Sequence, residues 1–171
     1  FNLALLREGG FPSERLVNGG ALRHEYLYSR FNGTKERRQK TVLVTFPLSR
    51  PASRRLFSDL LEELREPLTI PSQGNTPVRF ILKCHPQLPI RMFYPGRFKL
   101  PLWVTLSDEP MSKILPEAGL LLYAGPTSTW WEAVLSGVPA LKYGVDLLDI
   151  DSNGSVNGIP VHLCSKETLR S

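Results

Sequence analysis

Runs of consecutive apolar, often β-branched residues recur along this sequence, with breaks or helical segments between them. The first is Thr41-Val42-Leu43-Val44-Thr45-Phe46. Strands with one wet face alternate apolar and polar residues, whereas continuous apolar runs are typical of strands buried on both faces. Parallel neighbours need a crossover, usually a helix. The order of segments therefore predicts a parallel sheet covered by helices.

Six strands and three main helices are expected from this pattern. Residues 53–66 carry leucines at helical spacing, and Pro67 ends that helix. The expected strands are 41–46, 78–84, 102–106, 119–124, 138–143 and 159–163, and the further helices are 109–117 and 130–136. The predicted fold class is α/β, a Rossmann-like parallel sheet of about six strands with helices on both faces.

The predicted sheet occupies only part of the chain. Residues 1–40 have weak periodicity and many breakers, including Gly9-Gly10 and Gly19-Gly20, so we expect a linker or interdomain segment there. Residues 41–171 form the expected domain. The start at Phe1, without Met or a signal-peptide pattern, suggests the interior of a longer polypeptide.

Charge is unevenly distributed along the chain. Residues 1–100 hold 17 Lys/Arg and 8 Asp/Glu (+9), and residues 101–171 hold 4 and 8 (−4), which gives the net +5. This asymmetry favours an anionic partner near the first part: a nucleotide phosphate, nucleic acid or an acidic membrane surface. The cluster Arg37-Arg38-Gln39-Lys40 lies in an expected loop and also fits a solvated basic loop.

Cysteines and acidic pairs give little sign of a metal site. Cys84 and Cys164 are far apart, so a zinc site or disulfide framework is not expected, and a reducing, cytoplasmic compartment fits best. Asp149-Ile150-Asp151 has metal-binding spacing, but it follows the fifth strand and is interpreted as a solvated acidic turn. No apolar run reaches the roughly 18 residues of a membrane-spanning helix.

Candidate binding residues follow the first, second and fourth strands. Ligands of open parallel sheets bind outside the carboxyl ends of the strands. The first strand ends at Thr45-Phe46-Pro47-Leu48-Ser49-Arg50, the second at Lys83-Cys84-His85-Pro86 and the fourth at Gly125-Pro126-Thr127-Ser128-Thr129. Together they supply hydroxyls, a cation and an imidazole, a set that suits a phosphate or diphosphate. Cys84 points away from Lys83 and His85 and is expected in the core.

The helix after the fourth strand is the strongest candidate element. Its first turn presents unpaired N–H groups, to which Thr127, Ser128 and Thr129 add hydroxyls. Glu132 lies one turn further, where a carboxylate accepts hydrogen bonds from a ribose diol. An ordinary capping box, with Ser128 or Thr129 as cap and Glu132 as its partner, explains the same pattern. Trp130-Trp131 are expected to pack, although one could wall a nucleotide pocket.

These residues resemble the C-terminal, donor-binding domain of GT-B fold glycosyltransferases, which consist of two Rossmann-like halves. Residues 125–139 (GPTSTWWEAVLSGVP) resemble the stretch that holds the sugar nucleotide in such enzymes. Residues 83–86 (KCHP) resemble the Lys-x-His-Pro element of bacterial capsule and surface-polysaccharide transferases. Residues 17–23 (VNGGALR) resemble their interdomain linker.

The resemblance implies a role for each matched residue. Ser128 and Thr129 would bind the phosphates, Glu132 the ribose hydroxyls, and His85 the donor phosphate. It implies no cofactor or metal, and a UDP- or CMP-linked sugar donor foremost, with a guanosine donor also open. The acceptor site and catalytic base would lie in an N-terminal domain, so this chain alone would be an inactive donor half, and its enzyme would meet membrane-linked acceptors peripherally.

Two other functions remain open from the sequence. Nonhydrolysing UDP-GlcNAc 2-epimerases share the two-domain architecture and the kind of nucleotide pocket. A non-enzymatic module that binds nucleotides or nucleic acid also fits the basic charge, but the aromatic residues do not interleave with the basic cluster as a stacking platform requires. Nucleic acid is therefore not the expected partner.

Overall fold

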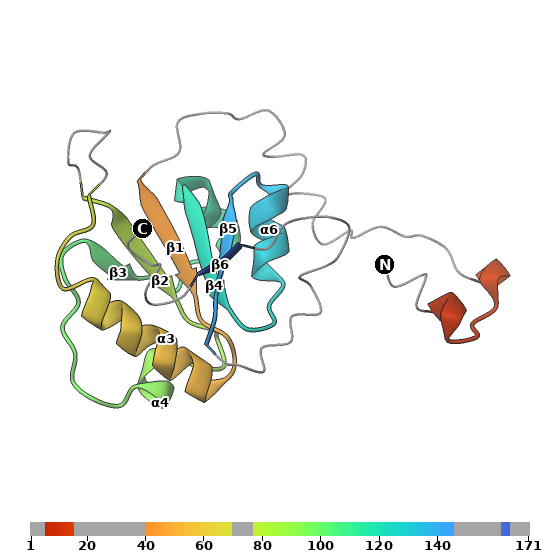
Figure 1. Ribbon diagram of the computed structural model, residues 1–171, viewed down its shortest axis with the longest axis horizontal. Coiled ribbons are helices and arrows are strands. Elements are labelled where there is room, and N and C mark those ends of the chain that lie inside the picture. Colours follow the sequence, from red (N-terminus) through yellow and green to blue (C-terminus); the bar gives the residue numbers. More distant parts are fainter. Residues whose placement is uncertain (1–5, 16–39, 70–76, 146–161, 165–171) are drawn as a thin grey trace.

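The computed structural model describes residues 6–15, 40–69, 77–145 and 162–164, and within them all six strands are parallel in one sheet (Figure 1). Its strand order is β3-β2-β1-β4-β5-β6. The strands are β1 Thr41–Thr45, β2 Arg79–Lys83, β3 Val104–Leu106, β4 Leu120–Ala124, β5 Ala140–Tyr143 and β6 His162–Cys164. The predicted α/β class is confirmed.

One short helix precedes the first strand, and the other helices lie between the first five strands. They are η1 Ser13–Arg15, α3 Arg50–Glu63, α4 Ile90–Phe93, α5 Met111–Ile114, η3 Leu115–Glu117 and α6 Thr129–Leu135. Helix α3 begins three residues earlier than expected because the Ser49 side chain caps it, accepting the Ala52 N–H at 3.5 Å. The single turn α4, which begins after Pro89, was not expected because prolines interrupt the local periodicity.

Two expectations fall partly on residues outside the described ranges. The last expected strand, 159–163, is found as β6 at His162–Cys164, and residues 159–161 lie outside the description. The interpretation of residues 1–40 as a linker stays a prediction, because residues 1–5 and 16–39 also lie outside.

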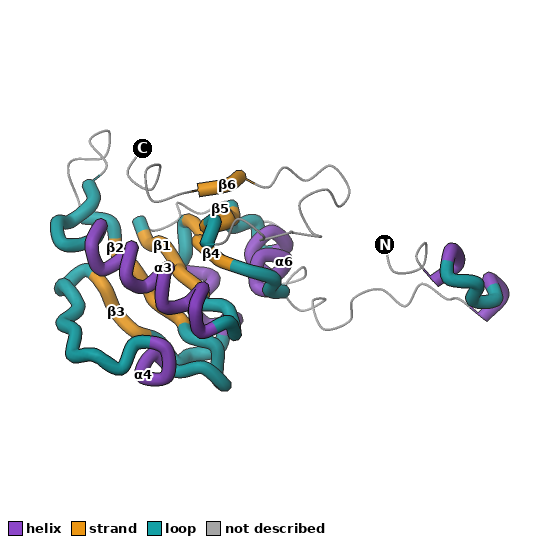
Figure 2. The backbone as a smooth tube through the Cα atoms, turned by 60° about the horizontal axis from the view of Figure 1, so that its bottom comes forward, coloured by secondary structure: helices purple, strands orange, loops and turns teal. Residues whose placement is uncertain are grey.

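Helices α3 and α4 cover one face of the sheet (Figure 2). Val44, Leu82 and Leu122 of three neighbouring strands pack against Leu56 and Phe57 of α3. Aromatic rings extend this core, with Phe57 meeting the rings of Phe46, Phe93, Tyr94 and Phe98. Because alternate strand residues point to opposite faces, the intervening residues form a second core.

The second face is covered by α5, η3 and α6. Leu43 and Leu121 lie there with Leu115, Trp130 and Ala133, all of them buried. The sheet is therefore apolar on both sides, which explains why its strands lack an alternating pattern. No helix in the described ranges is both long and apolar enough to span a membrane.

The strand order reverses between β1 and β4. The chain moves outward from β1 to β2 and β3, then returns to place β4 on the other side of β1 (Figure 1). The loops after β1 and β4 therefore depart to opposite faces at the carboxyl edge, which is where ligands of such sheets bind.

Candidate functional site

The loops that follow β1 and β4 come into close contact at this reversal point. Gly125, the first residue after β4, has a φ of +65°, and a Cβ placed on it would lie 3.2 Å from Cβ of Pro47. Only glycine adopts that conformation easily and allows so close an approach. The Pro47 carbonyl accepts a buried hydrogen bond from Ser53 Oγ at 2.7 Å, which ties the first loop to α3.

Three threonines from these segments form a hydroxyl cluster. Thr45 Oγ1 lies 3.3 Å from Thr129 Oγ1, which in turn lies 3.1 Å from Thr127 Oγ1. Thr127 Oγ1 also accepts the Thr129 N–H at 3.3 Å. Thr45, Thr127 and Thr129 are hereafter called the threonine cluster. Because each hydroxyl can rotate to donate or to accept, the cluster can turn its protons toward an anion.

Ser128 and Glu132 lie at the start of α6, Ser128 between two members of the threonine cluster and Glu132 one turn into the helix. Ser128 is the exposed N-cap of α6, yet its side chain makes no capping hydrogen bond. The Ser128 hydroxyl therefore does not cap the helix as expected, and the Trp131 N–H instead donates to the Ser128 carbonyl at 3.2 Å. Glu132 is half-buried one turn into the helix, and its N–H reaches the Ser128 carbonyl at 3.4 Å.

Lys83 and His85 reach the same edge from β2. Lys83 is the register partner of Thr45, and its Nζ donates to the Glu109 carbonyl at 2.7 Å. His85 Nδ1 accepts the Gln87 N–H at 3.2 Å. A neutral imidazole that accepts at Nδ1 carries its proton on Nε2 and can donate there. These bonds go to neighbouring loops and not to the threonine cluster, so the structure brings Lys83 and His85 to the edge without joining them to it.

A row of polar side chains extends sideways from Thr45 across four strands. Lys83 pairs with Thr45, Thr45 with Tyr123, and Tyr123 with Lys142. Register partners of parallel strands share a face, so all four leave the sheet on the α6 side. Lys83, Thr45, Tyr123 and Lys142 are hereafter called the polar row. Thr45 is 5% exposed and Lys142 only 1%.

Tyr123 and Lys142 were not among the residues expected at the site, and Thr45 was expected there only as part of the segment that ends the first strand. A lysine within the apolar run 138–143 was a local signal for Lys142, because a lysine is rarely fully buried unless it is paired. The end of the first strand placed Thr45 at the carboxyl edge, but its contact with Thr129 depends on the pairing of β1 with β4.

Cys84 and Trp130 belong to the cores, as expected. Cys84 is half-buried against the α3 face, and burial raises the pKa of its thiol from 9.0 to about 11. Trp130 is buried on the other face and stacks on Trp131 with ring centroids 3.9 Å apart. Its indole Nε1–H has no hydrogen-bond partner in the described part of the chain.

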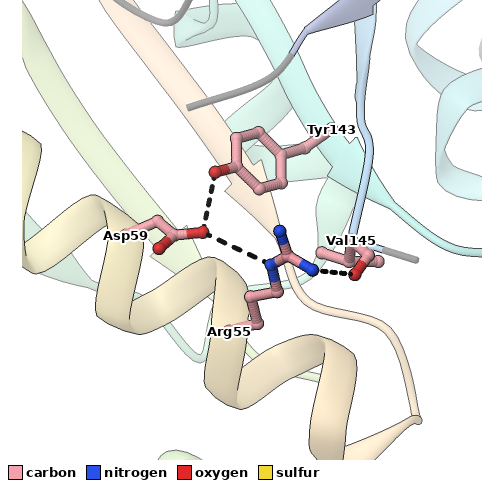
Figure 3. A network of polar contacts seen from close by, with 4 residues as sticks. All are labelled: Arg55, Asp59, Tyr143 and Val145. Carbon is pink, nitrogen blue, oxygen red and sulfur yellow. Dashed lines mark hydrogen bonds and ion pairs between the residues drawn. The ribbon is translucent and has the colours of Figure 1, made fainter. Parts of the chain in front are cut away.

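A polar network holds the end of β5 against α3 (Figure 3). Tyr143 donates its hydroxyl proton to Asp59 Oδ2 at 2.8 Å, and Arg55 Nε lies 3.9 Å from the same oxygen. Arg55 Nη1 donates to the Val145 carbonyl at 2.9 Å. The Arg55 side chain is 63% exposed, so a guanidinium group lies accessible where β5 leaves the sheet.

Acidic and metal-ligating side chains do not gather in the described ranges. No group of three or more His, Cys, Asp or Glu residues lies together there in a way that could hold a metal ion. Asp149 and Asp151, which have metal-binding spacing but were interpreted as a solvated acidic turn, lie outside the described residues.

Searches against protein-family models, curated proteins and solved structures give no significant match to this chain. The functional inference therefore rests on the residues and geometry described above.

Proposed function

We propose that this chain is the donor-binding domain of a GT-B type glycosyltransferase, which moves a sugar from a nucleotide to an acceptor in surface-polysaccharide or glycolipid synthesis. The observation that carries the proposal is the threonine cluster at the reversal point between β1 and β4. Hydroxyls at this point of an open parallel sheet are suited to the phosphates of a nucleotide.

Each residue at the edge has a place in this proposal. Thr127, Ser128 and Thr129 bind the donor phosphates, Glu132 accepts the ribose hydroxyls, and His85 donates from Nε2. As the bond between sugar and phosphate breaks, negative charge develops on the leaving phosphate, and preorganised donors stabilise it. Lys83, fixed by the Glu109 carbonyl, adds a cation with donors to spare. A partner domain supplies the acceptor and the catalytic base.

Titration of the ¹⁵N-labelled chain with UDP, CMP, GDP and AMP tests this proposal by NMR. One nucleotide should shift the amides of Thr127, Ser128, Thr129 and Glu132 together with the His85 ring signals. The nucleotide that does so also identifies the base. Absence of these shifts for all four nucleotides at millimolar concentration would contradict the proposal.

Removal of a single hydroxyl group is a more specific test of the same proposal. Thr129→Val keeps the side-chain shape and should weaken binding about tenfold to a hundredfold, since a hydrogen bond to a charged group contributes about 1.5–3 kcal/mol. Thr105→Val is the matched control. Thr105 lies on the edge strand β3, where its hydroxyl donates to the Phe80 carbonyl at 3.4 Å, away from the threonine cluster. An equal effect of the two substitutions would argue against phosphate binding at the cluster.

The place of action follows from the same proposal. Lipid-linked acceptors are reached at a membrane surface, and the basic first part of the chain suits the anionic inner leaflet. We therefore place the enzyme in the cytoplasm with peripheral membrane contact, which binding to anionic liposomes measures.

A further inference from the structure

Positive charge and exposed apolar side chains coincide in one part of the chain. Residues 67–107, from the end of α3 to the end of β3, contain five Lys/Arg and no Asp or Glu. They therefore supply +5 of the +9 carried by residues 1–100. Of the five large hydrophobic side chains exposed in the described ranges, three lie in the same stretch, namely Met92, Leu102 and Leu106.

The segment between α4 and β3 runs along the outer flank of the sheet, beside the edge strand β3 (Figures 1 and 2). Phe98 and Leu100 pack against the core beneath α3, and the ring centroid of Phe98 lies 5.1 Å from that of Phe57. Arg97 and Lys99, which alternate with these anchors, are exposed. The exposed residues of this surface, hereafter called the basic flank, are Arg91, Met92, Arg97, Lys99, Leu102 and Leu106.

Leu102 lies at the tip of a turn that is fixed to the sheet. The Pro101 carbonyl accepts the Val104 N–H at 3.0 Å, which closes a turn with Leu102 and Trp103 at its centre. The Trp103 carbonyl accepts the Phe80 N–H of β2 at 2.8 Å. Leu102 is 98% exposed, so nearly its whole side chain is available for burial against a partner without any change in the fold.

Two more cations lie at the same end of the sheet as this turn. Arg79, the exposed first residue of β2, donates its N–H to the Lys40 carbonyl at 2.8 Å. Its neighbour Phe80 bonds the turn that carries Leu102. The starts of β1, β2 and β3 therefore bring Lys40 and Arg79 to the end of the sheet at which Leu102 is exposed.

The side chains of the basic flank favour an anionic lipid surface over other anionic partners. Single-stranded nucleic acids stack on exposed aromatic rings, but Phe93 and Phe98 pack inward on Phe57. The cores of protein interfaces are depleted in charged residues, lysine among them. Apolar side chains that enter the acyl boundary, beside Lys and Arg that meet anionic headgroups, are typical of segments that bind membrane surfaces.

We propose that the basic flank is the surface by which this domain docks on an anionic membrane, with Leu102 entering the boundary between headgroups and acyl chains. This inference rests on the peripheral contact in the proposed function and assigns it to particular residues. The cations attract the anionic headgroups, and Leu102 adds apolar burial. One leucine is too small to hold the chain alone, so binding still requires low salt.

Co-sedimentation with vesicles of phosphatidylcholine and phosphatidylserine in equal parts tests the inference. Leu102→Ser should weaken binding at least tenfold, since full burial of a leucine contributes more than this factor. Phe11→Ser is the matched control and should change binding less than twofold. Phe11 is 57% exposed, but the two Arg and two Glu within four positions of it cancel in charge.

The cations are tested in the same assay. Arg97→Gln combined with Lys99→Gln should weaken binding about twentyfold, since each cation near an anionic surface contributes about fivefold. Lys113→Gln is the control, because Lys113 Nζ already pairs with Glu109 Oε2 at 2.7 Å, and its effect should stay below twofold. None of these substitutions should change nucleotide affinity, because the threonine cluster lies on β1 and at the start of α6.

A fluorescent label reports insertion directly. In the Cys164→Ser background, where the buried Cys84 reacts slowly, an NBD group attached at Leu102→Cys should shift its emission to the blue on the anionic vesicles. The same group at Phe11→Cys should not shift.

Other results would overturn the inference in distinguishable ways. Equal binding of wild type and Leu102→Ser, or no emission shift at position 102, would favour a protein partner for the basic flank and overturn the inference. If wild type does not bind the anionic vesicles, the peripheral contact fails and the inference fails with it. In each case the nucleotide titration decides separately whether the nucleotide site stands.

Discussion

Lys83 and Cys84 are neighbours in sequence with opposite surroundings. Lys83 leaves β2 on the α6 face and donates to the Glu109 carbonyl, whereas Cys84 packs against the core beneath α3. The pleat of a strand separates them, because successive side chains point to opposite faces. Lys83 therefore lies at the polar edge of the sheet, whereas Cys84 packs in the apolar core.

The buried thiol of Cys84 should react slowly. Burial raises its pKa from 9.0 to about 11, so the reactive thiolate at pH 8 is about a hundredfold scarcer than for an unperturbed thiol. We expect alkylation of the native Cys164→Ser variant by iodoacetamide to be at least this much slower than alkylation in urea. A native rate within tenfold of the unfolded rate would contradict this.

The raised pKa of Cys84 also makes the stability of the fold depend on pH. The folded state keeps the Cys84 proton to a higher pH than the unfolded state does, because burial disfavours the thiolate. The contribution of this group is therefore complete below about pH 9 and is lost as the pH rises toward 11. Comparison with Cys84→Ala over this range isolates it from the other groups that titrate there.

Helix α3 and strand β5 are joined by a side-chain hydrogen bond as well as by apolar packing. Tyr143 is buried at the end of β5, and its hydroxyl reaches Asp59 of α3 at 2.8 Å. Tyr143→Phe keeps the ring and removes this bond to a charged acceptor. We expect the free energy of unfolding, measured in urea, to fall by about 1.5–3 kcal/mol.

Tyr94→Phe is the matched control for this element. The Tyr94 ring packs on Phe57 of the same helix, with centroids 5.0 Å apart, and its substitution leaves the Asp59 bond intact. Its effect should be smaller by about 1 kcal/mol or more, the central value for one net hydrogen bond. Equal effects of the two substitutions would show that the bond between Tyr143 and Asp59 does not stabilise the fold.

The elements themselves were largely predictable, because their signals are local. Apolar runs indicated the strands, and leucine spacing indicated α3. The turn α4 was missed where Pro89 and Pro95 obscure the period. The sequence did not predict the strand order, because pairing of β1 with β4 depends on contacts between distant segments. The threonine cluster was therefore predicted in part: Thr127 and Thr129 were expected to bind phosphate and Thr45 was expected at the same edge, but the contact between Thr45 and Thr129 was not predicted.

At the scale of the whole molecule, charge is the feature that the fold does not explain. The first hundred residues carry +9 and the remainder −4. This uneven charge distribution does not determine the architecture, but it favours association with anionic surfaces. Within the described ranges, exposed arginines lie on α3 and α4, including Arg50, Arg54 and Arg91. Arg37 and Arg38 lie outside the description and add to the same part of the sequence.

The charge asymmetry predicts binding to vesicles that contain phosphatidylserine. Each Lys or Arg near an anionic surface contributes about 1 kcal/mol, so replacing Arg37, Arg38 and Lys40 by Gln should weaken co-sedimentation up to about a hundredfold. The matched control replaces Lys113, Lys166 and Arg170, three cations of the acidic part, and should have little effect. Both binding and the difference between the variants should vanish in high salt, because surface charges are screened. If the two triple variants bind equally at low salt, the asymmetry serves a different partner, and the peripheral membrane contact is wrong while the nucleotide site stands.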